Sequence, residues 1–320
     1  MTTGKDLLAE FSSGNVRGLA RAITLVEQRD PAVRELMESL SDRVRRPIVL
    51  GFTGAPGTGK STLVDGLIAY LRERGAAVAV ISVDPNSPYT GGAILGDRIR
   101  MQRHALDPKV FIRSMGARGH LGGLSAASGE AIHLMGAFGF DYVILETVGV
   151  GQSELEVAAV ADTTLVLLTP GLGDAVQLIK AGITEIADVF VVNKADLPGA
   201  QKALLELRAV VGMGPKEGWK PPIVATVALR GEGVEEMMAA IESHLRYREG
   251  SAEARQRAEA RLRDEAADLV GEWSRAEARR LLDEDPELAG RLLRDRTPYA
   301  AATEILTRWR GGARVAPGDG

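Results

Sequence analysis

The feature that most constrains this chain is a glycine-rich segment of eight residues, Gly54-Ala-Pro-Gly-Thr-Gly-Lys-Ser61. It matches the pattern G-x-x-x-x-G-K-[ST], which in nucleotide-binding α/β proteins follows a strand and opens a helix. An apolar run precedes it at 48–53, and a helical pattern begins at Lys60. The glycines let backbone N–H groups surround phosphate oxygens, and the helix N-terminus adds a positive dipole end. The segment predicts a nucleoside triphosphate site.

Within this P-loop, the lysine and the serine carry distinct expected roles. Lys60 is predicted to reach the β- and γ-phosphates, and Ser61 to bind Mg²⁺. The residues predicted here to contact the nucleotide are Gly54, Ala55, Pro56, Gly57, Thr58, Gly59, Lys60, Ser61 and Thr62.

Strand-like and helical patterns alternate along residues 47–250. β-rich runs occur at 48–53, 77–84, 110–113, 142–146, 164–169, 189–193 and 223–227, and helical patterns at 61–74, 126–138, 200–211 and 234–245. Such alternation is typical of βαβ units with a mostly parallel sheet. We therefore expect an α/β fold, a P-loop domain whose central sheet is flanked by helices.

The segments on either side of this domain have helical character. Residues 1–46 carry apolar faces at helical spacing, with Asn15 as the expected N-cap, and predict an N-terminal helical extension. Residues 251–320 predict a C-terminal helical region with a flexible tail: a stripe from Leu262 to Trp273, then shorter helices around Leu281, Leu292 and Ile305. Its interspersed charges fit either a solvated surface or a dimer or partner surface.

Composition excludes several classes of protein. The net charge of -4 gives no sign of nucleic-acid binding, and the absence of cysteine excludes thiolate metal sites. No stretch reaches the roughly 18 apolar residues of a membrane span, and the N-terminus opens no signal peptide. We expect a cytoplasmic protein with no nucleic-acid or membrane partner.

A second motif, Asn193-Lys-Ala-Asp196, indicates which base is bound. Guanine presents N1–H and N2–H₂ side by side, which suits the two acceptor oxygens of Asp196, whereas adenine presents an acceptor at N1. The aliphatic stem of Lys194 can lie against the ring. We predict that Asn193, Lys194 and Asp196 bind guanine.

Two further segments point to the metal and the γ-phosphate. Glu146-Thr-Val-Gly149 resembles the motif D-x-x-G with glutamate in the first place, so Glu146 is predicted to hold Mg²⁺ and Gly149 to sense the γ-phosphate. Gln152 is the candidate for orienting the attacking water. The turn-rich segment Asp84–Asp97 predicts a loop ordered by Mg²⁺. The alternative for Glu146 is a glutamate that merely ends a strand, and the alternative for Asp84–Asp97 is an ordinary surface loop.

Longer strings resemble one family, the MeaB/MMAA/ArgK P-loop G proteins, which are chaperones of adenosylcobalamin-dependent acyl-CoA mutases. The resemblance runs from about residue 14 to about 306. It is carried by Asp84–Met101, Glu146–Glu154, Pro170–Asp174 with Gln177 and Lys180, and Glu185–Asp196.

This resemblance implies a homodimer with helical extensions, in which the C-terminal helices contribute to dimerisation. It implies Mg²⁺ held by Ser61, with Asp84, Asp97 and Glu146 nearby. It also implies that residues 169–181 relay the nucleotide state to the mutase, with Asp174, Gln177 and Lys180 at the signalling positions.

Two departures from the family pattern stand out. The loop expected near guanine O6, usually Ser-Ala followed by a basic residue, reads Val227-Ala228-Leu229, so its useful donor is the Ala228 backbone N–H. Asp174 is followed by Ala175-Val176, where many relatives carry an acidic residue and then an apolar one.

The motifs predict a GTPase that uses GTP/GDP and Mg²⁺. The resemblance implies that it is slow alone and stimulated by its partner, and that it gates adenosylcobalamin loading and the protection and reactivation of a methylmalonyl-CoA-mutase-type enzyme. The first alternative is an ATPase or kinase linked to basic amino-acid transport. The second is a metallochaperone GTPase, which the lack of cysteine and of clustered histidine disfavours.

Overall fold

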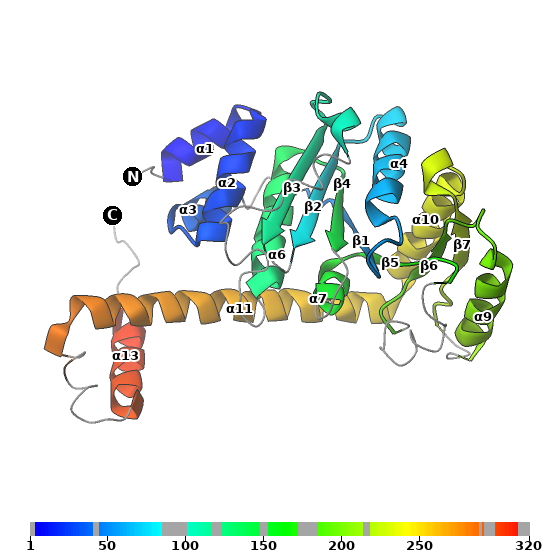
Figure 1. Cartoon of the computed structure of the whole chain (residues 1–320). Helices are drawn as coiled ribbons and strands as arrows, with labels where there is room; N and C mark the ends of the chain where they lie inside the picture. Colours follow the sequence, from blue (N-terminus) through cyan, green and yellow to red (C-terminus); the bar gives the residue numbers. More distant parts are fainter. Residues whose placement is uncertain are drawn as a thin grey trace. The chain divides into compact units, whose positions relative to one another are not determined.

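A seven-stranded sheet forms the centre of the computed structural model, which describes residues 4–40, 45–84, 101–116, 123–147, 153–171, 185–213, 218–287, 290 and 298–312 (Figure 1). Its order is β3-β2-β4-β1-β5-β6-β7, and each pair of neighbouring strands is parallel. The strands are β1 (Ile48–Gly54), β2 (Val78–Asp84), β3 (Val110–Gly116), β4 (Tyr142–Thr147), β5 (Thr163–Leu168), β6 (Val189–Asn193) and β7 (Ile223–Thr226). The predicted α/β fold is confirmed.

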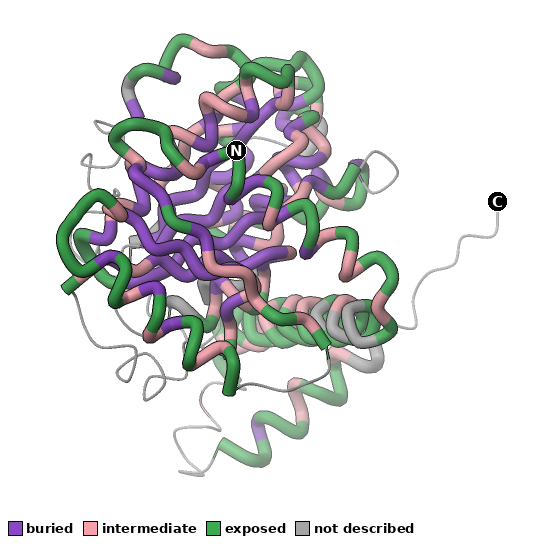
Figure 2. Tube along the Cα trace, turned by 90° about the vertical axis from the view of Figure 1, so that its right-hand side faces the viewer, coloured by how far each residue is buried: buried purple, intermediate pink, exposed green. Residues whose placement is uncertain are grey.

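Helices cover both faces of the sheet, and the strands between them are almost entirely buried (Figure 2). One face packs against α4 (Lys60–Glu73) and α10 (Val234–Gly250), with Phe52, Leu67 and Ile241 fully buried between them. On the other face lie α6 (Gly123–Phe138), α7 (Ser153–Val160) and α9 (Ala200–Gly212). Because β1 and β4 to β6 are apolar on both sides, parallel strands in this three-layer arrangement are the stable solution.

Three N-terminal helices pack beside this domain: α1 (Gly4–Ser12), α2 (Val16–Gln28) and α3 (Ala32–Leu40). Asn15 caps α2 as predicted, its side chain accepting a hydrogen bond of 2.9 Å from the backbone N–H of Arg17. The apolar face of α2 joins the core beside α6. Arg113 of β3 contacts the side chains of Glu27 and Thr24, which ties α2 to the edge of the sheet.

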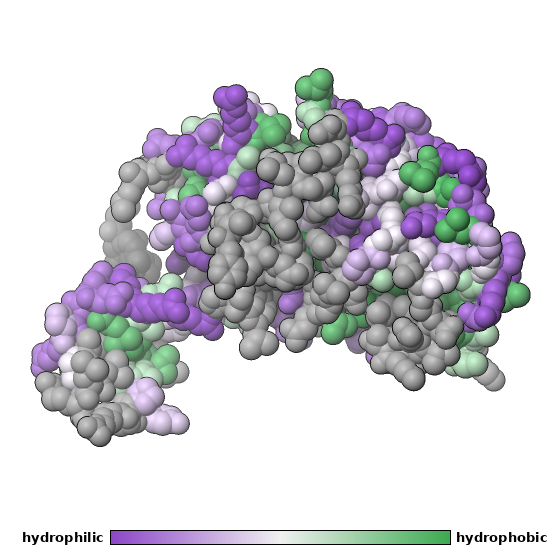
Figure 3. All heavy atoms as spheres, viewed as in Figure 1, coloured by the Kyte–Doolittle hydropathy of each residue, from purple (hydrophilic) through white to green (hydrophobic). Residues whose placement is uncertain are grey.

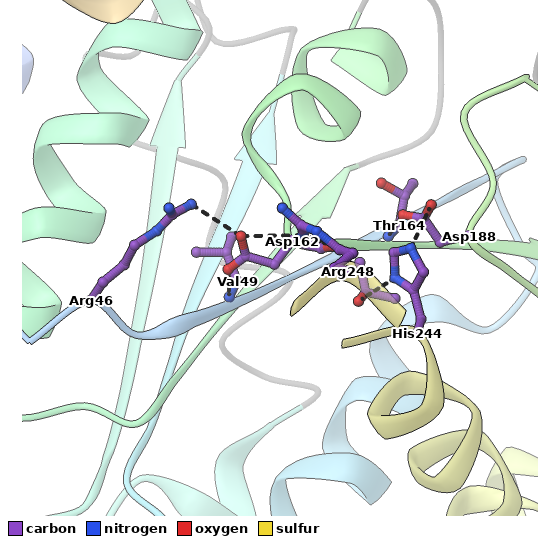
Figure 4. A network of polar contacts seen from close by, with 8 residues as sticks. Arg46, Val49, Asp162, Thr164, Asp188, His244 and Arg248 are labelled. Atoms are coloured by element: carbon purple, nitrogen blue, oxygen red, sulfur yellow. Dashed lines mark hydrogen bonds and ion pairs between the residues drawn. The ribbon is translucent and has the colours of Figure 1, made fainter. Parts of the chain in front are cut away.

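Aspartates that precede the strands organise the edge of the sheet where β5 and β6 begin (Figure 4). Asp162 accepts a 2.9 Å hydrogen bond from the backbone N–H of Val49 and pairs with Arg46 and with Arg248 of α10. Asp188 likewise accepts from Thr164 N–H at 2.8 Å and lies 3.2 Å from Nε2 of the buried His244. These contacts fasten α10 to the strand starts and leave the opposite, carboxyl ends for ligand binding.

The chain divides into two compact units, residues 1–261 and 262–320. The boundary falls inside α11 (Ala252–Glu284), and α13 (Pro298–Gly312) belongs to the second unit. Hydrophilic residues cover much of the visible surface of α11 (Figure 3). The separate helix expected around Leu281 is a correction: this residue continues α11, since neither Gly nor Pro interrupts 272–284. Leu292 lies outside the described residues.

Among the residues that the structure describes, no helix is both long enough and apolar enough to cross a bilayer.

Candidate nucleotide-binding site

The P-loop joins the end of β1 to the start of α4 and depends on two glycines with positive φ. Gly54 has φ +140, and a Cβ there would lie 2.3 Å from the carbonyl oxygen of Leu167 in β5. Gly59 has φ +89, and a Cβ there would lie 2.4 Å from Nδ2 of Asn193. Because both positions need a left-handed backbone and a close approach, only glycine fits them without strain.

Lys60 begins α4 and is buried, with 6% of its surface exposed. Its ammonium group donates hydrogen bonds to the carbonyl oxygens of Gly54 at 2.7 Å and Ala55 at 3.1 Å. The P-loop thus folds around its own lysine, so that a positive charge is already desolvated at the start of the helix. Anionic phosphate oxygens are the acceptors that such a buried ammonium group favours most.

A cavity of about 520 Å³ opens at this end of the sheet. Its volume is in the range of ligand-binding pockets. It is lined by Pro56, Gly57, Gly59, Lys60, Ser61, Thr62, Glu146, Thr147, Asn193, Lys194, Asp196, Leu197, Val227, Ala228 and Leu229. The structure therefore brings the predicted P-loop, glutamate and base motifs to one cavity. Gly54, Ala55 and Thr58 are not among the lining residues and act through their backbone carbonyls, which accept from Lys60 and Asn193.

At the phosphate end, the hydroxyl of Ser61 donates a hydrogen bond of 2.5 Å to Oε1 of Glu146. Both residues are buried, and Glu146 lies near the end of β4, beside β1 in the sheet. Hard oxygen donors of this kind are the ligands that Mg²⁺ takes in nucleotide sites, so the residues present fit a magnesium ion. Asp84 ends β2, the other neighbour of β4, and Asp97 lies outside the described residues.

At the other end of the cavity, Asn193 links three segments. Its Nδ2 donates to the carbonyl oxygen of Thr58 at 2.8 Å, and its Oδ1 accepts from Thr226 Oγ1 and from Ala228 N–H, each at 3.1 Å. The Ala228 N–H predicted to face guanine O6 is therefore engaged by Asn193. Lys194 has φ +56 and donates from Nζ to the carbonyl oxygen of Gly57 at 2.9 Å. The base motif thus braces the P-loop.

Two features of the base end were not predicted: Leu197 as a lining residue, and an ion pair made by Asp196. Leu197 and the predicted Leu229, with 46% and 89% of their surface exposed, line the cavity and add apolar walls of the kind that suits a planar base. Asp196 is paired with Arg230, whose Nη1 lies 3.2 Å from Oδ2. Leu197 directly follows the base motif, which was the available sequence signal. The ion pair joins residues 34 positions apart, and no spacing rule indicates it.

Several predicted residues fall outside the part of the chain that the structure describes: Asp97, Gly149, Gln152, Asp174, Gln177 and Lys180. They remain predictions.

The fold and the cavity define a class. A protein whose parallel sheet carries a P-loop and a predicted base-binding motif at the same edge belongs to the P-loop nucleotide-binding proteins. A solved crystal structure described as that of a LAO/AO transport system kinase shares the fold, with a TM-score of 0.67 and 26% identity, over 96% of this chain and 97% of its own.

Sequence comparison gives the family. The model for "Methylmalonyl Co-A mutase-associated GTPase MeaB" matches residues 19–280, and the chain belongs to this family, which also includes ArgK and MMAA. A protein of Mycobacterium tuberculosis named as a probable GTPase is 41% identical over 328 residues, covering 95% of this chain and 94% of its own. The GTPase ArgK of Escherichia coli is 41% identical over 245 residues, 74% of each chain. The chain is therefore a GTPase of the MeaB/MMAA/ArgK family.

Proposed function

We propose that this GTPase is a chaperone of an adenosylcobalamin-dependent acyl-CoA mutase of the methylmalonyl-CoA mutase type. In this role it gates loading of the cofactor and protects and reactivates the mutase. The observation that carries the proposal is the match of the mutase-associated family model to residues 19–280, which spans the whole nucleotide-binding domain.

The base end of the cavity supports selection of guanine. Asp196 lines it with a carboxylate that can accept from N1–H and N2–H₂ together. Lys194, tied to the carbonyl oxygen of Gly57, holds its aliphatic stem beside the same space. Val227, Ala228 and Leu229 line the neighbouring wall and are proposed to contact the base.

The phosphate end supports hydrolysis of the β–γ bond. Lys60 is proposed to exchange the carbonyl oxygens of Gly54 and Ala55 for β- and γ-phosphate oxygens, which stabilises charge that develops during transfer. Ser61 and Glu146 would hold Mg²⁺, with Asp84 and Asp97 nearby; when bound, the ion neutralises charge on the phosphates. Water attacks in line, and we propose that Gly149 senses the γ-phosphate and that Gln152 orients the water.

Segments that respond to the γ-phosphate would signal to the mutase whether GTP or GDP is bound. We propose that 84–97, 147–154 and 169–181 adopt one arrangement with GTP and another with GDP, and that Asp174, Gln177 and Lys180 relay the difference. The active species is proposed to be a homodimer in the cytoplasm. Intrinsic hydrolysis is slow in this scheme, because completion of the site depends on the partner.

The test measures GTP hydrolysis and adenosylcobalamin transfer with purified methylmalonyl-CoA mutase, in its apo and cofactor-loaded forms. We expect the mutase to raise the hydrolysis rate by about tenfold or more, which corresponds to about 1.4 kcal/mol of barrier. We also expect cofactor loading to differ between the GTP- and GDP-bound chaperone. Unchanged hydrolysis and unchanged cofactor exchange with every candidate mutase would refute the proposal.

Two variants serve as controls in that test. Lys60→Ala removes the phosphate-binding ammonium group and should abolish stimulation. Lys202→Ala removes an exposed lysine of α9, whose side chain is 78% exposed, and should leave both readouts unchanged.

A further inference from the structure

The Asp196 carboxylate, which is proposed to read guanine, forms an ion pair with Arg230, a residue that does not line the cavity. Arg230 Nη1 lies 3.2 Å from Asp196 Oδ2. The same guanidinium is gripped by Glu232, with Nε to Oε1 at 2.6 Å and Nη2 to Oε2 at 3.2 Å. Two parallel hydrogen bonds of this kind fix the plane of a guanidinium group, which a single contact does not.

The loop that carries Arg230 and Glu232 is tightly folded. Val227 N–H donates to the carbonyl oxygen of Glu232 at 3.0 Å, and Arg230 N–H donates to that of Val227 at 2.9 Å. The short helix η4 (Ala228–Arg230) ends at Gly231, which has φ +71. A Cβ on Gly233 would lie 2.2 Å from the carbonyl oxygen of Ala225. The backbone therefore presents the two side chains to each other independently of any ligand.

The position of Arg230 distinguishes a residue that competes with the base for Asp196 from one that orients Asp196 for the base. Asp196 lines the cavity, but Arg230 and Glu232 do not. An arginine inside the cavity would compete with the base for the carboxylate, whereas one that approaches from outside leaves the inner lone pairs available, because each carboxylate oxygen can accept two hydrogen bonds. The hydrogen bonding between Arg230 and Glu232 also lowers the pKa of Glu232 and raises the pKa of Arg230. Both partners hence stay charged at neutral pH.

We propose that Arg230, oriented by Glu232, is a positioning residue for base recognition that holds the Asp196 carboxylate in the rotamer guanine requires. The charges of Asp196, Arg230 and Glu232 sum to one negative charge. Arg230 and Glu232 therefore orient Asp196 without cancelling its attraction for N1–H and N2–H₂. The proposal rests on the proposed reading of guanine by Asp196, and it adds a determinant of specificity.

The experiment compares dissociation constants for GDP and IDP, which lacks only the 2-amino group. In Arg230→Ala we expect the GDP-over-IDP preference to fall by about two- to fivefold, the range of an exposed ion pair. Glu232→Ala should give a smaller fall in the same direction. Thermal unfolding of the free protein should change little, because both side chains are exposed. Arg246→Ala is the matched control: it breaks an exposed pair with Glu242 within α10, away from the cavity lining, and should leave the preference unchanged.

A double-mutant cycle shows whether Arg230 acts through Asp196. In an Asp196→Asn background, Arg230→Ala should have no further effect on the GDP-to-IDP ratio. An unchanged ratio in the single variant, or tighter binding of GDP, would overturn the positioning role, and the second result would instead mark Arg230 as a competitor of the base. Failure of the guanine reading itself is separately visible, since ADP would then bind the unmodified chain as tightly as GDP.

Discussion

Asn193 donates a hydrogen bond from its side-chain amide to the carbonyl oxygen of Thr58, 2.8 Å away and 135 residues earlier in the chain. The same side chain accepts hydrogen bonds from Thr226 and Ala228. One buried amide therefore connects the phosphate-binding loop, the base motif and the loop after β7.

Asn193→Ala should disrupt both stability and nucleotide binding. It removes three hydrogen bonds at a residue that is 1% exposed, so the groups that bonded to Asn193 lose that partner. We expect the free energy of unfolding to fall by about 1–3 kcal/mol. Urea unfolding and fluorescent GDP titration measure the two effects. Thr226→Val breaks only one of the three bonds and should have a smaller effect on each; equal effects from the two variants would contradict a bridging role for Asn193.

Asp196→Asn should exchange guanine for xanthine. An asparagine amide places a donor where guanine also presents one, whereas xanthine carries a carbonyl oxygen at C2 that can accept. We expect GDP to bind about 10- to 100-fold more weakly and XDP to bind more tightly, from the cost of mispaired polar groups. Competition titrations with GDP, XDP and ADP are the measurement. A variant that retains the wild-type order of affinities would exclude Asp196 from base reading.

Ser61→Ala should make hydrolysis depend on a higher magnesium concentration. The hydroxyl lies against Glu146 in the proposed metal site. Loss of a group that only orients a metal ligand typically lowers metal affinity by about 10- to 100-fold, and we expect loss of a ligand to lower it at least as much. A titration of hydrolysis rate against Mg²⁺ gives the half-saturation point. Ser128→Ala, which alters a buried serine of α6 that does not line the cavity, should leave that point in place. If both variants behave like the unmodified chain, Ser61 is not a ligand.

Two glycine substitutions should have opposite effects on stability. A Cβ on Gly51 of β1 would lie 2.7 Å from Cγ1 of Val157 and 2.9 Å from Cβ of Ala161, so Gly51→Ala should lose about 1–3 kcal/mol by overpacking. In α4, a Cβ on Gly66 would meet Val234 at an ordinary 3.6 Å, and Gly66→Ala should gain up to about 1 kcal/mol from helix propensity. Chemical denaturation of both variants checks the signs, and a stabilising Gly51→Ala would show that α7 can move away from β1.

Acid should weaken one contact between α4 and the segment before β3. The hydrogen bond from Arg72, and then that from Lys109 N–H, lower the pKa of Asp107 below its ordinary value of 3.8. Because the folded pKa is the lower one, the stabilisation is present above about pH 4 and is lost as the pH falls through the folded pKa. Asp107→Asn should therefore flatten the decline of unfolding free energy below pH 4. Parallel acid titrations of the two proteins would contradict this coupling.

The prediction of the fold succeeded where the signal was local. The strands at 48–54, 142–147 and 189–193 are short apolar runs buried on both faces, and such runs are detectable without knowledge of their neighbours. The continuation of α11 through Leu281 was missed, because a charged, exposed helix carries little periodic apolar signal.

Within the candidate site, the sequence alone determined the chemistry available: glycines that tolerate positive φ, a lysine and a serine at a helix start, and an amide and a carboxylate after a buried strand. Only the tertiary structure decided which of these groups meet, since the order of parallel strands brings segments that are 34 to 135 residues apart to one edge of the sheet. The Arg230–Asp196 pair and the Asn193–Thr58 bond both arise in this way. Such contacts depend on side-chain geometry across separate loops, which no residue spacing encodes.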